Sequence, residues 1–133
     1  MQPIFDNLEF LIESPVSKQN RVRGYDALIE QGLINIEPLT YIRGRSIPHQ
    51  FMIVDEAQNL TPHEIKTIIT RVGEGTKIVL TGDPYQIDNP YVDSISNGLS
   101  HVVERFKRTA MAGHVTLMRG ERSALAEMAA NIL

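Results

Sequence analysis

The chain is 133 residues long, contains no cysteine and carries a formal net charge of −3 at pH 7. Its length suits one domain but is short for a complete nucleotide-driven motor, and the lack of cysteine excludes a disulfide framework and a thiolate metal site. The charge argues against a broadly basic surface that coats nucleic acid, and the short apolar runs predict neither a membrane span nor a signal peptide, so we expect a soluble, cytoplasmic protein without membrane contact.

The first part of the chain predicts two helices and a strand. Apolar residues recur at helical spacing over residues 3–13, and a polar, turn-rich segment follows. A second helix is expected over residues 21–31, with Gly32 as its C-terminal cap. The alternating residues 33–37 predict a strand, and residues 40–50 read as irregular.

Two uninterrupted apolar runs predict the central strands. Residues 51–55 and 77–81 have the composition of strands that are buried on both faces of a parallel sheet. The helix between them has a clear start signal, with Thr61 as the cap, Pro62 at the first helical position and Glu64 at the third.

The last part of the chain continues the alternation of strand and helix. A long loop from Gly82 to about Ser96 precedes a helix over residues 97–108, a strand over 114–118 and a final helix marked by Leu125, Met128, Ala129 and Ile132. Alternating strands and helices predict an α/β fold with a mainly parallel sheet and helices on both faces.

Two adjacent carboxylates end the first of these central strands. Asp55 and Glu56 stand where a parallel strand opens onto the ligand side of an α/β sheet. Successive strand residues point to opposite sides, so Asp55 can hold a magnesium ion through water while Glu56 polarises an attacking water. The alternative is that both are loop-edge or capping acids, which strand ends often carry.

The second strand ends in a polar segment that runs from Thr81 to Gln86. Gly82 lets the backbone approach a ligand closely, Asp83 follows it at the predicted nucleotide site, and Gln86 can hydrogen-bond a γ-phosphate or orient water. The alternative is a plain turn, because Gly-Asp-Pro is turn chemistry.

The sequence lacks the glycine-rich loop that binds the phosphates in many nucleotide-hydrolysing enzymes. No Gly-x-x-x-x-Gly-Lys-Ser/Thr occurs in the 133 residues. The sequence therefore predicts that the chain is the second half of a nucleotide-hydrolysing enzyme.

The segment from Thr40 to Ser46, the Asp55-Glu-Ala-Gln58 box and the segment from Leu80 to Asp88 are similar to the PhoH-like ATPases, relatives of the superfamily 1 helicase core. Gly120-Glu-Arg-Ser123 resembles the subset that carries a PIN nuclease domain before the ATPase. The resemblance implies a P-loop NTPase, RecA-like partial domain over residues 1–133, running from Walker B to the C-terminal helix with Walker A absent.

The same resemblance implies what the longer chain does and which residues do it. It implies an ATP- and magnesium-dependent ATPase with RNA as substrate and a hexameric, homo-oligomeric ring. By position, the resemblance implies that Asp55 and Glu56 are the Walker B pair and that Gln86 is the γ-phosphate sensor.

Each of three arginines can have either a functional or a purely structural role. Arg43 and Arg45 precede the Asp-Glu strand, where they could reach nucleotide phosphate or nucleic acid, or simply lie on the surface. Arg122 falls in the first turn of the last helix, where a cation opposes the helix dipole. It suggests either a finger that reaches the nucleotide of a neighbouring subunit or a pair with Glu121 or Glu127.

Other residue types give weaker signals. The four histidines show no metal-ligand spacing, and Tyr85 and Tyr91 could stack a base or cover the sheet edge. The sequence predicts an α/β half-domain, the Walker B to sensor portion of an ATP-dependent nucleic-acid-remodelling enzyme. Its rival is a non-catalytic regulatory or assembly module that retains the fold.

Overall fold

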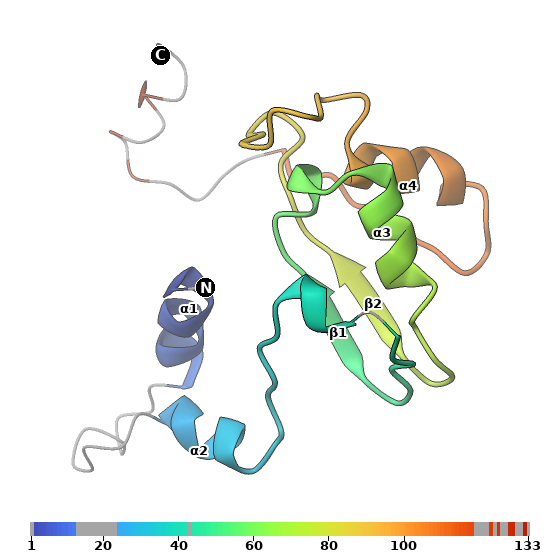
Figure 1. Ribbon diagram of the computed structural model, residues 1–133. Coiled ribbons are helices and arrows are strands. Elements are labelled where there is room, and N and C mark those ends of the chain that lie inside the picture. The colour runs from blue at the N-terminus through green and yellow to red at the C-terminus, as the bar shows by residue number, and fades with distance from the viewer. Residues whose placement is uncertain are drawn as a thin grey trace. The chain divides into compact units, whose positions relative to one another are not determined.

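The computed structural model describes residues 2–12, 24–42 and 44–118, together with Ser123, Leu125, Met128, Ala129 and Ile132. The chain divides into two compact units, Met1–Ile42 and Arg43–Leu133. Figure 1 shows the elements of each unit. The expected final helix falls mostly outside the described residues, so it stays a prediction.

The first unit consists of short helices. α1 spans Gln2–Ile12, α2 spans Gly24–Glu30, and a 3₁₀ turn, η2, spans Leu39–Ile42. α1 contacts α2 through the rings of Phe5 and Tyr25, whose centroids lie 5.6 Å apart. Both predicted helices are therefore confirmed, with slightly different bounds.

The end of α2 follows the predicted cap, but the next segment does not form a strand. Gly32 has φ +69°, and the N–H groups of Gly32 and Leu33 donate to the carbonyls of Ile29 and Leu28 at 2.9 Å each. The prediction of a strand over residues 33–37 was wrong, because these residues have no strand pairing and Leu33 is exposed. Alternation alone makes no strand where no neighbouring backbone is available.

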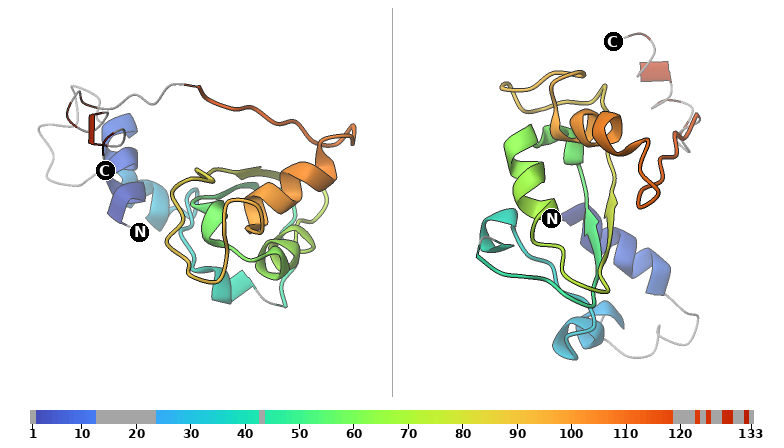
Figure 2. Two further views of the ribbon diagram at one scale, coloured as in Figure 1. Left: turned by 90° about the horizontal axis from the view of Figure 1, so that it is seen from above. Right: turned by 90° about the vertical axis from the view of Figure 1, so that its right-hand side faces the viewer.

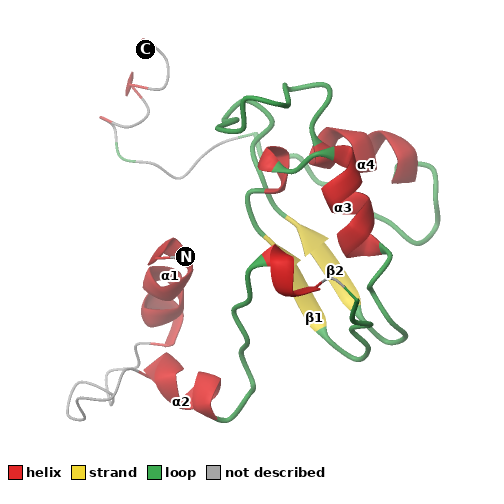
Figure 3. Cartoon of the chain, viewed as in Figure 1, coloured by secondary structure: helices red, strands yellow, loops and turns green. Residues whose placement is uncertain are grey.

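The second unit holds a two-stranded parallel sheet. β1 (Phe51–Val54) pairs with β2 (Lys77–Leu80), as Figure 3 shows. In this pairing Phe51 lies opposite Lys77. α3 (Pro62–Ile69) connects the strands, and α4 (Gly98–Phe106) follows the long loop. The predicted α/β class and the parallel sheet are confirmed.

The start of α3 has the predicted capping box. The Thr61 hydroxyl accepts the N–H of Glu64 at 3.2 Å, and the Glu64 carboxylate accepts the N–H of Thr61 at 2.8 Å. Pro62 takes the first helical position, where its missing N–H costs no hydrogen bond.

The core lies between the sheet and the two helices of this unit. α3 and α4 cover the same face of the strands (Figure 2), and alternate strand residues point into the core with them. The buried core residues are Val54, Ala57, Leu60, Ile65 and Ile68.

The opposite face of β1 is uncovered in the described part of the chain. Phe51 and Ile53 are 65% and 62% exposed, while Val54 is buried. The expectation of strands buried on both faces, with helices on both, is therefore met on one face only. The described residues supply helices for that face alone.

The segment after α4 differs from the prediction. Residues 114–118 form no strand, and Val115, Leu117 and Met118 are exposed. This strand prediction was wrong for the same reason as the earlier one, since no described neighbouring backbone pairs with the segment. None of the helices described is long and apolar enough to cross a membrane.

Candidate functional site

The carboxyl ends of β1 and β2 lie side by side, as predicted. The N–H of Thr81 donates to the carbonyl of Val54 at 3.0 Å, and the N–H of Ala57 donates to the carbonyl of Thr81 at 2.9 Å. The ladder thus continues beyond the strands themselves. It brings the Asp55-Glu56 pair next to the polar segment that begins at Thr81.

Asp55 and Glu56 leave the strand in different conformations. Both are exposed, and the Asp55 carboxylate accepts a hydrogen bond from the Thr81 hydroxyl at 2.7 Å. Glu56 adopts a left-handed backbone with φ 54° and ψ 37°, which is uncommon for a residue with a side chain. This conformation turns the chain into the short 3₁₀ helix η3 (Ala57–Asn59).

Gln58 connects the two polar segments. Its side chain is fully buried, and its Nε2 donates to the Glu56 carboxylate at 2.5 Å and to the carbonyl of Gln86 at 2.9 Å. Its Oε1 accepts the N–H of Asp83 at 3.3 Å. The Glu56 carboxylate and the loop after β2 therefore share one buried amide.

The buried Gln58 amide leaves room only for a glycine at position 82. A Cβ at position 82 would stand 2.2 Å from Oε1 of Gln58 and 3.1 Å from Cδ2 of Leu99. The sequence predicted that Gly82 lets the backbone approach a ligand, and the structure shows a close approach to Gln58 instead. A role of Gly82 in nucleotide binding stays a prediction.

Asp83 organises the turn that carries Gln86. Its carboxylate accepts the N–H of Tyr85 at 2.9 Å and the side-chain Nε2 of Gln86 at 2.7 Å. The Gln86 amide therefore lies against Asp83 here. The sensor role of Gln86 and the nucleotide contact of Asp83 are untested predictions.

The rest of the loop is held by side chain–backbone hydrogen bonds. Asn59 Oδ1 accepts the N–H groups of Asp88 and Asn89 at 2.7 and 3.2 Å. The pKa of the Asp93 carboxyl lies below its ordinary value because the backbone N–H groups of Ser96 and Ile95 donate to it. This loop therefore has a defined shape and a negative charge.

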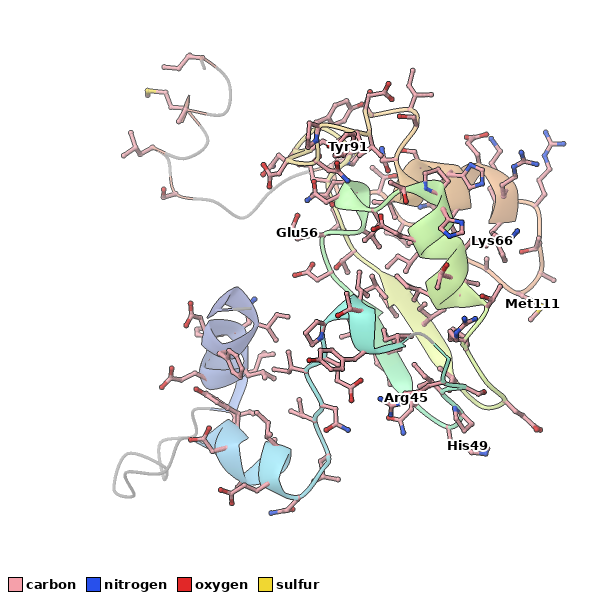
Figure 4. All side chains as sticks on the ribbon, viewed as in Figure 1. Arg45, His49, Glu56, Lys66, Tyr91 and Met111 are labelled. Atoms are coloured by element: carbon pink, nitrogen blue, oxygen red, sulfur yellow. The ribbon has the colours of Figure 1, made fainter. Side chains whose placement is uncertain are left out.

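Two aromatic side chains project from this loop. Tyr85 and Tyr91 are 89% and 88% exposed, and Figure 4 shows Tyr91 at the same end of the unit as Glu56. The side chains are thus accessible to a partner. Neither covers a sheet edge, which was the alternative prediction.

The predicted arginines are not brought to this site by the described residues. Arg45 lies at the amino ends of the strands, whereas Glu56 lies at their carboxyl ends (Figure 4). The neighbouring backbone bridge between Ile47 and Val72 also precedes both strands. A contact of Arg45 with nucleotide at the carboxyl ends has no support in this arrangement, and Arg43 and Arg122 lie outside the described residues.

The donor set at the strand ends suits magnesium in part. Mg²⁺ takes oxygen ligands, keeps several waters and usually binds one or two carboxylates together with substrate phosphates. The exposed Asp55 carboxylate, oriented by the Thr81 hydroxyl, fits such a position. The described residues hold no group of three or more His, Cys, Asp or Glu side chains that could form a metal centre by themselves.

Sequence reasoning missed the connecting residues. Gln58 was part of the acidic box but received no role, and Asn59 received none either. The signal available was a pair of amide residues directly after the two acids, in a segment otherwise flanked by Ala57 and Leu60. Amide side chains at such a turn can satisfy backbone groups of a neighbouring loop.

Comparisons with known proteins agree with this architecture. The family model for PhoH-like proteins matches residues 1–132. The chain is 60% identical over 134 residues to the protein PhoH2 of Bacillus subtilis (strain 168), a match that covers 100% of this chain and 29% of that protein. It is 39% identical over 132 residues to PhoH2 of Mycolicibacterium smegmatis, covering 99% of this chain and 28% of that protein.

A third relative is shorter. The chain is 36% identical over 107 residues to a PhoH-like protein of Bacillus subtilis (strain 168), covering 80% of this chain and 30% of that protein. The chain thus spans less than a third of the length of these relatives. With its parallel strands and the acidic pair at their carboxyl ends, the chain belongs to the PhoH family, whose fold is that of the P-loop NTPases.

Proposed function

We propose that the complete protein is a magnesium-dependent ATPase that couples ATP hydrolysis to the unwinding or remodelling of RNA, and that this chain supplies its water-activating part. One observation carries the proposal: Asp55 and Glu56 stand at the carboxyl end of a parallel strand, and the Asp55 carboxylate accepts a hydrogen bond from Thr81 at the end of the adjacent strand. Open α/β sheets bind their ligands at this edge.

The reaction assigns separate roles to the two acids. The oxygen of a water attacks the γ-phosphorus, the bond from phosphorus to the bridging oxygen breaks, and ADP keeps the electron pair. Glu56 accepts the proton of the attacking water. Asp55 would hold magnesium through water, and the ion would neutralise charge on the phosphate oxygens.

Gln86 is the proposed γ-phosphate sensor. Its side-chain amide donates to Asp83, so a contact with phosphate requires this hydrogen bond to be exchanged. The exchange gives the loop two arrangements, one with Gln86 on Asp83 and one with Gln86 on the nucleotide. Backbone groups around Gly82 would then border the nucleotide.

The proposed RNA contact and assembly rest on other features. Tyr85 and Tyr91 offer exposed rings for base stacking. No Lys or Arg occurs from residue 78 to residue 104. The RNA phosphates would therefore bind basic residues outside this segment. The proposal includes a hexameric ring in which Arg122 reaches the nucleotide of the next subunit, and a PIN domain earlier in the chain.

Phosphate release by the purified complete protein tests the proposed function. We expect ATP hydrolysis that needs magnesium, stops in EDTA and rises when single-stranded RNA is added. The 133-residue chain alone should release no phosphate, since the loop donors and lysine that bind a triphosphate are not part of it. A complete protein that binds no ATP, or hydrolysis that is insensitive to EDTA, would contradict the proposal.

A further inference from the structure

Gln58 is placed to do more than fill the core. Its side chain is one of two polar side chains described as fully buried, the other being Asn97. A buried amide that loses a partner costs about 1–3 kcal/mol, so its hydrogen bonds are kept. Both of its donor bonds and its acceptor bond go to the two polar segments at the strand ends.

The bond to Glu56 restricts a side chain that is otherwise exposed. A glutamate side chain at the surface normally samples several rotamers. In each rotamer the carboxylate oxygens point in a different direction, so a proton would have to approach from a different side. Here Nε2 of Gln58 holds one carboxylate oxygen at 2.5 Å from within the core. Gln58 cannot turn away without leaving a buried N–H unpaired.

The bond to Gln86 ties the same amide to the sensor loop. The second Nε2 donor contacts the Gln86 carbonyl at 2.9 Å, and Oε1 contacts the N–H of Asp83. A movement of the loop backbone at Gln86 would therefore displace the amide that contacts Glu56. The two catalytic elements are linked through one side chain.

We propose that Gln58 is a positioning residue that orients the Glu56 carboxylate for proton abstraction and ties this orientation to the position of the Gln86 loop. The proposal rests on the proposed ATPase function. It predicts that Gln58 affects the chemical step much more than nucleotide binding, because the side chain is fully buried and donates to the Glu56 carboxylate.

Gly82 offers an independent way to disturb the same contact. A methyl group at this position would collide with Oε1 of Gln58 at 2.2 Å. Gly82→Ala therefore displaces the Gln58 amide without changing its chemistry. It should reproduce the kinetic effect of altering Gln58 itself.

The test uses the complete protein and single-turnover hydrolysis of bound ATP, with ATP affinity measured separately. Gln58→Met keeps the length of the side chain but removes the amide. We expect the hydrolysis rate to fall about 100-fold and the Kd for ATP to stay within about threefold. Gln50→Met is the matched control, since Gln50 is exposed just before β1, and it should leave both values unchanged.

A double mutant separates positioning from mere structural support. If Gln58 acts through Glu56, Gln58→Met should add little to the loss already caused by Glu56→Gln. Circular dichroism checks that each variant folds, and Gly82→Ala, which keeps the Gln58 amide itself, takes the place of Gln58→Met if that variant does not fold.

Several results would overturn the proposal. These are an unchanged hydrolysis rate in Gln58→Met or Gly82→Ala, a loss expressed in Kd alone, or a loss that multiplies fully with that of Glu56→Gln. If Glu56→Gln itself hydrolyses ATP at the parent rate, the proposed function is wrong. If Glu56→Gln is inactive and Gln58→Met is fully active, the function stands and the positioning role is wrong.

Discussion

Glu56 combines an uncommon backbone conformation with a tethered carboxylate. Its left-handed conformation costs roughly 1 kcal/mol for a residue with a side chain and persists where the surroundings determine it. The surroundings here are the turn into η3 and the amide of Gln58. Such strain is often found where a side chain must point in one direction, which agrees with a role in proton transfer.

Asp55 should act through the metal. In the complete protein, Asp55→Ala should weaken the affinity for ATP about tenfold or more in the presence of magnesium, since a charged ligand is lost. In EDTA the affinity should be unchanged. Isothermal titration under both conditions measures the effect.

Asp88 provides the control for this experiment. It is an exposed acid in the same loop, and its backbone N–H rather than its carboxylate contacts Asn59. Asp88→Ala should bind ATP like the parent. Equal weakening by Asp55→Ala with and without magnesium would show that Asp55 does not act through the ion.

The sequence indicated the two acids and Gly82, but not the contact of Gln58 that connects them. Asp55 and Glu56 are visible because an apolar run ends in two charges, which is a local pattern. Gln58 and Gly82 depend on a contact between segments that follow different strands. Such a contact appears only when the strands are paired in register.

Among the elements, α3 was predicted closely because its signals are local. Thr61, Pro62 and Glu64 specify the helix start within four residues, and the spacing of Ile65 and Ile68 places both side chains on its buried face. The two mistaken strands, 33–37 and 114–118, were predicted from the local sequence alone. A local sequence does not reveal whether a pairing edge exists, so such strands cannot be predicted from it.

The capping box of α3 should be measurable. Thr61→Ala should destabilise the first turn by about 1 kcal/mol, since it removes the acceptor for the N–H of Glu64. Hydrogen exchange of the α3 amides in the complete protein should then be about fivefold faster.

Thr67→Ala is the matched change within the same helix. The Thr67 hydroxyl donates to the carbonyl of His63, which already belongs to the helix, so its loss should have little effect. If both variants exchange at the same rate, the cap does not stabilise α3.

At the scale of the whole molecule, the most informative feature is the face of β1 that the described residues leave uncovered. Phe51 and Ile53 project from a strand of a fold in which parallel sheets are normally covered on both faces. In the relatives, which are more than three times as long as this chain, residues outside the matched segment are available for that face.

Ile53 tests whether the face is covered in the complete protein. Ile53→Asp should lower the melting temperature by several degrees, because it would bury an unpaired charge. Ile95→Asp, at a loop residue that is 84% exposed, should have little effect. Equal tolerance of both changes would mean that the face remains open to water.

Arg122 tests the proposed ring. Mixing complete Arg122→Ala subunits with Glu56→Gln subunits should restore part of the activity, because some interfaces would join an intact Glu56 to an intact Arg122. An arginine supplied in trans can raise the rate by about 10³-fold or more. No recovery at any mixing ratio, with ring assembly verified by light scattering, would indicate a role within one subunit.

The most direct measurement for the account is the hydrolysis of bound ATP by the complete Glu56→Gln protein. The change keeps the shape of the side chain but removes its ability to accept a proton. We predict that ATP and magnesium bind as in the parent, while the single-turnover rate falls by about 10²- to 10⁴-fold. Hydrolysis at the parent rate, or a loss of ATP binding without a slower chemical step, would contradict the assignment of Glu56 as the base.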